Sequence, residues 1–236
     1  MSTHIVLVPG YWLGGWAWDE VAPQLRDRGH RVTAVTLPGL ESPEADRSGI
    51  TLAHHADAIA AAVRSQPADR TLLVAHSGGA VPATVAVDRD PRLVDHVVYV
   101  DSGPAVDGLA LVPDLQGDEL PLPPWEQLTA MGNSLEGLDE DDLDRFRQRA
   151  VPQPAGTARE AVRLANPERF RVPGTLVCCS LRAADLPALA AQGVPFLAAL
   201  GDHDLRYVDL PTGHWPMWSR PVELAALLDE VARSLG

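Results

Sequence analysis

Short apolar runs rich in β-branched residues alternate along the chain with alanine-rich segments that favour helix. This pattern is typical of a parallel sheet whose two faces are both covered by helices. It predicts six strands, at Ile5 to Val8, Val32 to Thr36, Thr71 to Ala75, Val97 to Val100, Thr175 to Cys179 and Tyr207 to Leu210. It also predicts four helices, at Trp18 to Arg28, Leu52 to Ser65, Gly79 to Arg89 and Val222 to Leu235. The expected fold class is therefore α/β, with a doubly wound and mostly parallel sheet.

The alternation of strands and helices stops between Ala105 and Val172. No strand is expected in this stretch, because prolines interrupt it at Pro113, Pro121, Pro123, Pro124, Pro152 and Pro154. We predict a small helical lid over residues 105–172, inserted into a core formed by residues 1–104 and 173–236. Within the lid, residues 136–149 begin with acidic side chains and end with arginines. That order complements a helix dipole and predicts a solvated helix.

Length and charge restrict the classes of protein that the sequence fits. The 236 residues are enough for one domain with an insertion. The 19 basic residues are outnumbered by 32 acidic ones, and the net charge of −13 argues against nucleic acid or an anionic membrane surface as a partner. The chain contains no lysine. Schiff-base, pyridoxal phosphate, P-loop and kinase chemistry all depend on a lysine and are therefore excluded.

The first residues and the two cysteines bear on location. The segment before Ile5 has no basic region, and no small-residue cleavage site follows the short apolar run that starts there. No apolar run approaches the roughly 18 residues that a membrane span requires. Cys178 and Cys179 are neighbours in a predicted strand, where their side chains point to opposite faces and a disulfide between them would be strained. We expect a soluble, cytoplasmic protein with two buried thiols.

A sharp turn between a predicted strand and a predicted helix carries Ser77. The residues around it are all very small, as such a turn requires, because its strained backbone brings strand and helix close together. They are Ala75, Gly78, Gly79 and Ala80. The turn would expose the serine hydroxyl at the carboxyl edge of the sheet and leave the next N–H at a helix N-terminus. Ser77 is therefore a candidate nucleophile; the alternative is a simple helix N-cap.

The loop after the first predicted strand, from Pro9 to Trp16, leaves the sheet at the same edge. Its glycines allow backbone amides to turn inward, so the N–H of Tyr11 and that of Gly78 are candidates for a two-donor oxyanion hole. A dinucleotide-binding loop is the rival interpretation. It fails because the glycine spacing is wrong and bulky tryptophans would obstruct the pyrophosphate.

A histidine follows the last predicted strand. His214 lies between that strand and the last predicted helix, at the same sheet edge as Ser77. An imidazole titrates near neutrality and can accept the serine proton as a general base. A structural histidine is the alternative, but chain order and the shared edge favour the catalytic role.

With these motifs the chain resembles the α/β-hydrolase superfamily, in particular its small cofactor-free branch of plant-type methylesterases and hydroxynitrile lyases. The resemblance spans nearly the whole chain and includes the lid and the Gly213-His214 pair. The family often has histidine at the position of Pro9 and glycine at that of Ala75; neither departure removes a reacting group. The resemblance implies an esterase with a serine, histidine and acid triad that needs no cofactor.

The acid of this triad has two candidates. The superfamily usually carries it after the penultimate strand, which points to Asp185, although this residue also fits the N-cap of a short helix. Asp101 ends the buried run Val97 to Val100, beside the nucleophile strand, and some superfamily members resemble this arrangement. A carboxylate there needs a partner to offset its desolvation, and a histidine N–H would supply one. We favour Asp101.

These residues predict hydrolysis of a small apolar carboxylic ester through an acyl-enzyme. Candidates to line the substrate pocket are Trp12, Trp125, Trp215 and Met217, with core packing as the alternative. No metal is expected, since the sequence has neither a His-Glu-x-x-His helix nor a thiolate cluster.

Two other function classes remain as alternatives. In the lyase branch a lysine typically follows the catalytic histidine, whereas this chain has Trp215 there and no lysine. A ligand-binding homologue without activity would share the fold but would not need the serine, the histidine and the acid together.

Overall fold

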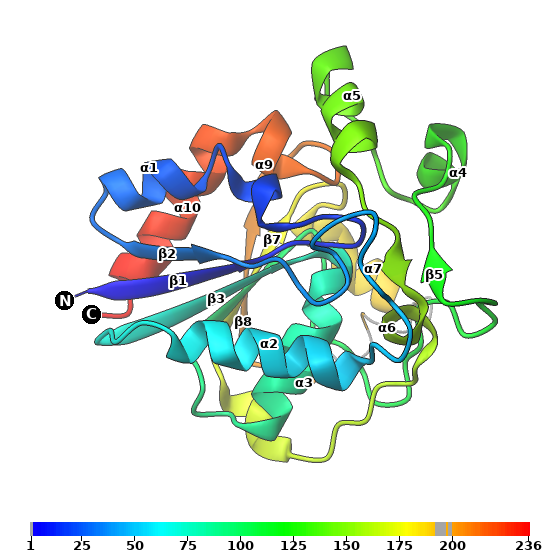
Figure 1. Cartoon of the computed structure of the whole chain (residues 1–236). Helices are drawn as coiled ribbons and strands as arrows, with labels where there is room; N and C mark the ends of the chain where they lie inside the picture. The colour runs from blue at the N-terminus through cyan, green and yellow to red at the C-terminus, as the bar shows by residue number, and fades with distance from the viewer. Residues whose placement is uncertain (1, 192–196, 198–199) are drawn as a thin grey trace.

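A six-stranded parallel sheet in the order β2-β1-β3-β4-β7-β8 forms the centre of the protein (Figure 1). This computed structural model describes residues 2–191, 197 and 200–236. The strands are β1 (Thr3–Val8), β2 (Arg31–Ala34), β3 (Arg70–His76), β4 (His96–Val100), β7 (Gly174–Cys178) and β8 (Leu205–Asp209). All six predicted strands are confirmed, with no end displaced by more than two residues. The predicted doubly wound α/β class is confirmed as well.

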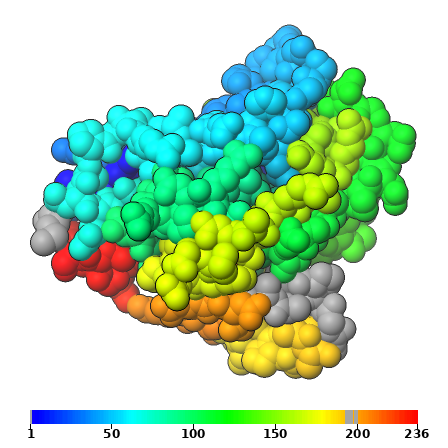
Figure 2. Space-filling view, turned by 90° about the horizontal axis from the view of Figure 1, so that it is seen from below, coloured from blue at the N-terminus to red at the C-terminus, as the bar shows by residue number. Residues whose placement is uncertain are grey.

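Helices cover both faces of this sheet. They are α1 (Ala22–Asp27), α2 (Leu52–Arg64), α3 (Ala80–Arg89), α7 (Leu186–Ala191), α9 (Pro216–Ser219) and α10 (Pro221–Arg233). Side chains of β1 alternate between the two faces, as strand geometry requires. Val6 and Val8 pack in the cluster that includes α2 and α3, and Ile5 and Leu7 pack in the cluster that includes α1 and α10. Figure 2 shows α2 and α3 over the first of these faces.

One predicted helix differs in the structure. The segment predicted as a single helix from Trp18 to Arg28 starts at the last residue of a short 3-10 helix, Gly15–Trp18, and its α-helix, α1, begins only at Ala22. Pro23 explains the break, because proline has no backbone N–H and is tolerated in an α-helix only in the first turn. The other three predicted helices correspond to α2, α3 and α10.

Most of residues 105–172 lies beyond the carboxyl ends of the strands, at the right of Figure 1, and the last part, with Pro167–Arg171, runs back along the bottom of the view to the start of β7. They form β5 (Glu119–Leu120), α4 (Trp125–Ala130), α5 (Glu140–Arg149), β6 (Gln153–Pro154), α6 (Ala155–Arg159) and a 3-10 helix (Pro167–Arg171). The predicted charged helix is α5, and the side chain of Asp139 caps it by accepting the N–H of Asp142 at 2.9 Å. The expectation of no strand was wrong, because β5 and β6 form a two-residue antiparallel pair.

The two cysteines are buried and free, on opposite faces of the sheet. Cys178 packs in the cluster that contains α2 and α3, and Cys179 packs in the other. Burial raises the pKa of the Cys178 thiol to about 11, so the thiol stays protonated at neutral pH. In the part of the chain that the structure describes, no helix is both long and apolar enough to cross a membrane.

Candidate active site

The turn at Ser77 has the strained geometry that its small neighbours predict. β3 ends at His76, a 3-10 turn covers Ser77–Gly79, and α3 follows directly. Ser77 has φ 50°, a left-handed conformation that non-glycine residues adopt at a cost of about 1–3 kcal/mol. A side chain on Gly79 would collide with the carbonyl oxygen of Pro9. The close approach of the loop after β1 therefore explains why this position is a glycine.

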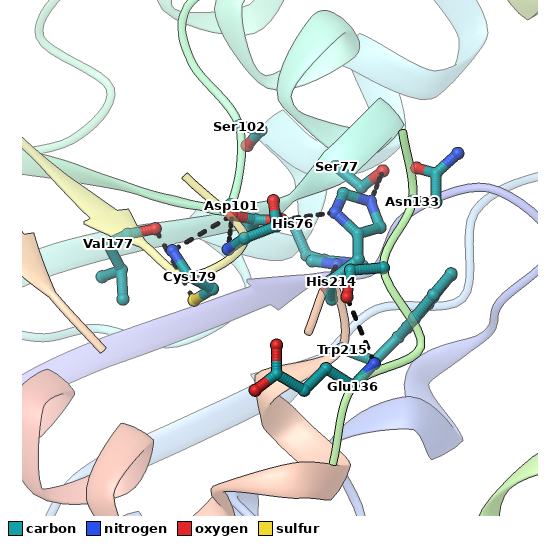
Figure 3. Close-up of polar contacts among 12 residues, drawn as sticks. His76, Ser77, Asp101, Ser102, Asn133, Glu136, Val177, Cys179, His214 and Trp215 are labelled. Carbon is teal, nitrogen blue, oxygen red and sulfur yellow. Dashed lines mark hydrogen bonds and ion pairs between the residues drawn. The ribbon is translucent and has the colours of Figure 1, made fainter. Parts of the chain in front are cut away.

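Ser77, His214 and Asp101 form a continuous hydrogen-bonded row (Figure 3). His214 Nε2 lies 2.7 Å from Ser77 Oγ, and His214 Nδ1 lies 2.6 Å from Asp101 Oδ2. The three residues come from the carboxyl end of β3, the loop after β8 and the end of β4. The structure thus brings together the predicted nucleophile, the predicted base and the acid that we favoured. The N-cap interpretation of Ser77 does not apply, because its hydroxyl contacts His214 instead of capping the turn.

Asp101 is held by four donors. Its Oδ1 accepts the N–H groups of Cys179 (3.1 Å) and Ser180 (2.8 Å), and its Oδ2 accepts the Ser180 hydroxyl (2.7 Å) besides His214. Burial alone would raise the pKa of Asp101, but the hydrogen bonds from His214 and Ser180 outweigh it and hold the pKa below its usual value. The carboxylate is therefore ionised at neutral pH and can orient the imidazole and stabilise its charge.

Asp185, the other candidate acid, lies away from this row. It is exposed, on the 3-10 turn Ala183–Asp185 that precedes α7. Among the described residues, no hydrogen bond or ion pair joins it to His214. Sequence reasoning did not identify Ser180, whose N–H and hydroxyl both contact Asp101; its only signal was a hydroxyl two residues after the end of β7.

The loop that carries His214 is supported by residues 134–136 of the insertion. Gly213 N–H donates to the carbonyl of Glu136 at 3.0 Å, and His214 N–H donates to that of Ser134 at 2.7 Å. A side chain on Gly213 would collide with backbone atoms of Ser134 and Glu136. The position of the imidazole therefore depends on a glycine and on the insertion.

Gly213→Ala is expected to lower kcat by about 10- to 100-fold, because a displacement of about 1 Å at a catalytic group has an effect of that size. Gly201→Ala is the matched control, since a side chain there meets no atom of the described residues within 4 Å. Steady-state kinetics and thermal unfolding of both variants check this. A Gly213→Ala enzyme with the wild-type kcat would contradict the proposed support.

His76 supports the same loop from below. Its Nε2–H donates to the backbone carbonyl of His214 at 2.7 Å, and its Nδ1 is buried without a hydrogen-bond partner. Burial is the main cause that lowers the pKa of His76 to about 3, and the nearby His214 contributes. His76 is therefore neutral at working pH. From the sequence, His76 could be recognised only as a neighbour of Ser77. Its hydrogen bond to a carbonyl 138 residues away cannot be predicted from the residues around it.

The buried histidines make stability depend on pH. Burial lowers the pKa of His55 to about 4 and that of His76 to about 3, whereas an unfolded histidine titrates near 6.5. Between about pH 6.5 and these lower values the unfolded chain binds more protons, so the free energy of unfolding falls as pH falls. Between pH 7.5 and 5.5 the two groups together are expected to remove about 2–3 kcal/mol.

Urea unfolding at the two pH values checks this prediction. His55→Gln should reduce the difference between the two pH values, and His54→Gln, at the exposed neighbouring position, should retain it. Equal or greater stability at pH 5.5 would contradict it.

The two residues predicted to supply the oxyanion donors, Tyr11 and Gly78, are in close contact. A side chain on Gly78 would approach Tyr11 Cδ1 to 2.5 Å, so the loop after β1 packs directly on the turn. Tyr11 is anchored by its hydroxyl, which donates to the carbonyl of Thr157 at 3.1 Å. Among the described residues, no protein acceptor is found for the Tyr11 backbone N–H. Tyr11 N–H therefore stays a candidate oxyanion donor.

A cavity lies beside His214 and Asp101. None of the four predicted pocket residues is among the described residues that line it. Met217 and Trp215 are almost completely buried and pack in the core cluster around Phe146. The Trp125 ring packs at a tilt against that of Phe146, with the ring centroids 5.5 Å apart. Trp12 donates its indole N–H to the carbonyl of Leu120 at 2.9 Å. Their packing corresponds to the core alternative, although Trp215 also contacts the His214 ring edge-on at 4.9 Å.

No group of three or more His, Cys, Asp or Glu side chains is arranged to hold a metal ion in the described part of the chain. The two ionisable groups of the row, Asp101 and His214, are paired with each other. A serine, a histidine and a carboxylate in one hydrogen-bonded row are the arrangement that acyl transfer requires.

Comparison with known proteins identifies the family. A model of the alpha/beta hydrolase family matches residues 5–227, and the chain belongs to this family. It is 30% identical over 198 residues to a carbendazim hydrolyzing esterase of Nocardioides sp. (strain SG-4G), covering 80% of this chain and 74% of that protein. It is 32% identical over 139 residues to methylesterase 3 of Arabidopsis thaliana, covering 58% of this chain and 49% of that protein. The chain thus falls in the branch that contains the plant methylesterases.

Solved structures share the fold at low sequence identity. A variant of tomato methylketone synthase I bound to beta-ketoheptanoate has a TM-score of 0.75 and 18% identity, with all of both chains covered. A pyrethroid hydrolase from Sphingobium faniae JZ-2 has a TM-score of 0.68 and 20% identity, covering 99% of this chain and 98% of the other. These neighbours support the α/β-hydrolase fold.

Proposed function

We propose that this protein is a serine esterase that hydrolyses a small apolar carboxylic ester through an acyl-enzyme. The observation that carries the proposal is the pair of short hydrogen bonds from Ser77 through His214 to Asp101. The esterases among its relatives support the same activity, although the matches cover about three quarters of the Nocardioides protein and about half of methylesterase 3.

In the proposed acylation step, His214 Nε2 takes the Ser77 proton as Oγ attacks the ester carbonyl carbon. The N–H groups of Tyr11 and Gly78 donate to the oxyanion, and the loss of one such donor raises the barrier by about 3–4 kcal/mol. Asp101 accepts the Nδ1–H of His214 and stabilises the imidazolium. When the tetrahedral intermediate collapses, the C–O bond to the alcohol breaks, and His214 returns its proton to the leaving oxygen.

Deacylation uses the same groups in reverse. A water molecule gives a proton to His214 and attacks the acyl carbon, and Ser77 leaves with the proton that His214 returns. The products are a carboxylic acid and an alcohol. No step requires a cofactor or a metal ion.

A fluorophosphonate probe tests the proposal directly, because it reacts only with an activated serine. We expect one adduct per chain by intact-mass spectrometry, located on Ser77 by peptide mapping, and proton release from simple esters in a weakly buffered assay. A folded protein that neither takes up the probe nor releases protons would contradict the esterase proposal and favour a ligand-binding homologue.

We also propose that residues 105–172 act as a lid and that the protein works in the cytoplasm on a small-molecule ester. The contacts of Ser134 and Glu136 with the His214 loop support the lid. The buried free thiols Cys178 and Cys179 suit a reducing compartment. Fractionation of the native host's cells tests the location; recovery outside the cytoplasm would contradict it.

A further inference from the structure

A cavity of about 340 Å³ opens beside the catalytic row. It is bounded by the carboxyl ends of β4 and β7, the turn after α4 and the start of α7. Its apolar walls include Met131, Leu176, Cys178, Leu181 and Leu186. The volume is many times what one water molecule requires, so the cavity can hold a sizeable organic group.

The cavity lies on one side of the reacting centre. Asp101 and His214 line it, whereas the nucleophile Ser77 and the oxyanion donors Tyr11 and Gly78 do not. Figure 3 shows Ser77 on the side of the His214 ring away from Asp101 and Val177, another lining residue. The free space therefore adjoins the general base, and it is lined neither by the nucleophile nor by the oxyanion donors.

The geometry of the tetrahedral intermediate decides which part of the ester, the acyl group or the alcohol, lies beside the cavity. The carbonyl carbon bonds to Ser77 Oγ, and its oxyanion must point to the backbone donors. The leaving oxygen must lie within hydrogen-bond reach of His214, which protonates it. The group attached to that oxygen then extends along His214 toward the cavity, and the acyl substituent takes the remaining direction.

The chemistry of the walls limits what fits there. The described lining residues include no arginine, and the Asp101 carboxylate would repel an anion. A charged leaving group is therefore disfavoured, and an apolar one gains from burial against the leucines and Met131. A methoxy group would leave most of the volume empty.

We propose that this cavity binds the leaving alcohol, and that the substrates are esters of bulky, uncharged, apolar alcohols. This inference rests on the esterase function proposed above and specifies its substrate class. It predicts a preference opposite to that of an enzyme built for methyl esters.

Two isomeric esters test the assignment. Benzyl acetate carries the aromatic ring on the alcohol, and methyl phenylacetate carries the same ring on the acyl group; methyl acetate is the common reference. Benzyl alcohol and methanol are leaving groups of similar acidity, so binding decides the difference. We expect kcat/KM for benzyl acetate to exceed that for methyl phenylacetate by at least about tenfold, because burial of an apolar group in a matching pocket has an effect of that size.

Filling the cavity should remove this preference. Leu181 is 41% exposed and lines the cavity, and Leu111 is 43% exposed and lies outside it, so Leu181→Trp and Leu111→Trp are a matched pair. The ratio of kcat/KM for benzyl acetate to that for methyl acetate should fall by about tenfold or more in Leu181→Trp and stay within about twofold in Leu111→Trp. Met131→Trp fills the cavity from another wall and repeats the test if Leu181→Trp does not fold.

The outcomes separate the two proposals. Hydrolysis with a preference for methyl phenylacetate, or a benzyl-to-methyl ratio that both cavity-filling variants leave unchanged, overturns the alcohol assignment and leaves the esterase function standing. No hydrolysis of any of the three esters, together with no fluorophosphonate adduct, overturns both.

Discussion

Ser77→Ala is expected to reduce kcat/KM for every ester substrate by at least about 10⁴-fold and to abolish labelling by a fluorophosphonate. The hydroxyl forms the covalent bond to the acyl group, and neither His214 nor the backbone donors can replace it. Residual catalysis would come only from the oxyanion donors and from binding. The fold should persist, because the Ser77 hydroxyl contacts His214 and caps no helix.

The control is Ser48→Ala, at an exposed serine whose hydroxyl, within the described part of the chain, bonds only to Asp46. It should retain wild-type kinetics and full labelling. Thermal unfolding of both variants excludes misfolding as the cause of any loss. Near-normal turnover by a folded Ser77→Ala enzyme would mean that another group attacks the ester, and the assignment of the nucleophile would be wrong.

The fold was predictable because its signals are local. The apolar runs that form β1 and β3 are buried on both faces, and such strands require unbroken apolar sequence. The candidate nucleophile was predictable for a similar reason, since the turn at Ser77 requires small residues next to it in sequence. His214 could be proposed because a loop after a parallel strand lies at a known edge of the sheet.

The acid and the pocket depend on contacts between distant segments. The choice between Asp101 and Asp185 turns on the pairing of β4 with β7, which brings the N–H groups of Cys179 and Ser180 to Asp101. Asp101 also adopts φ 44°, which no local sequence feature indicates. Methionine and tryptophan occur both in substrate pockets and in hydrophobic cores. The residue types of Met217 and Trp215 therefore do not distinguish these two roles, and only the packing around them does.

Asp101→Asn is expected to lower kcat by about 10³- to 10⁴-fold, whereas Asp185→Asn should stay within about twofold of the wild type. The hydrogen bonds around position 101 explain the size of the effect. The N–H groups of Cys179 and Ser180 would hold the amide oxygen where Asp101 Oδ1 now lies. The amide nitrogen would then face His214 Nδ1, 2.6 Å from the present carboxylate oxygen.

An amide nitrogen donates a hydrogen bond and does not accept one, so His214 Nδ1 would have to lose its proton. The neutral imidazole would then carry its proton on Nε2 and could not take the one from Ser77. The geometry would remain while the base is in the wrong tautomer, so kcat should fall far more than substrate affinity, and fluorophosphonate labelling should slow in parallel. Steady-state kinetics of both asparagine variants at pH 7.5 decides between the acids: a larger loss in Asp185→Asn would show that Asp101 is a structural carboxylate.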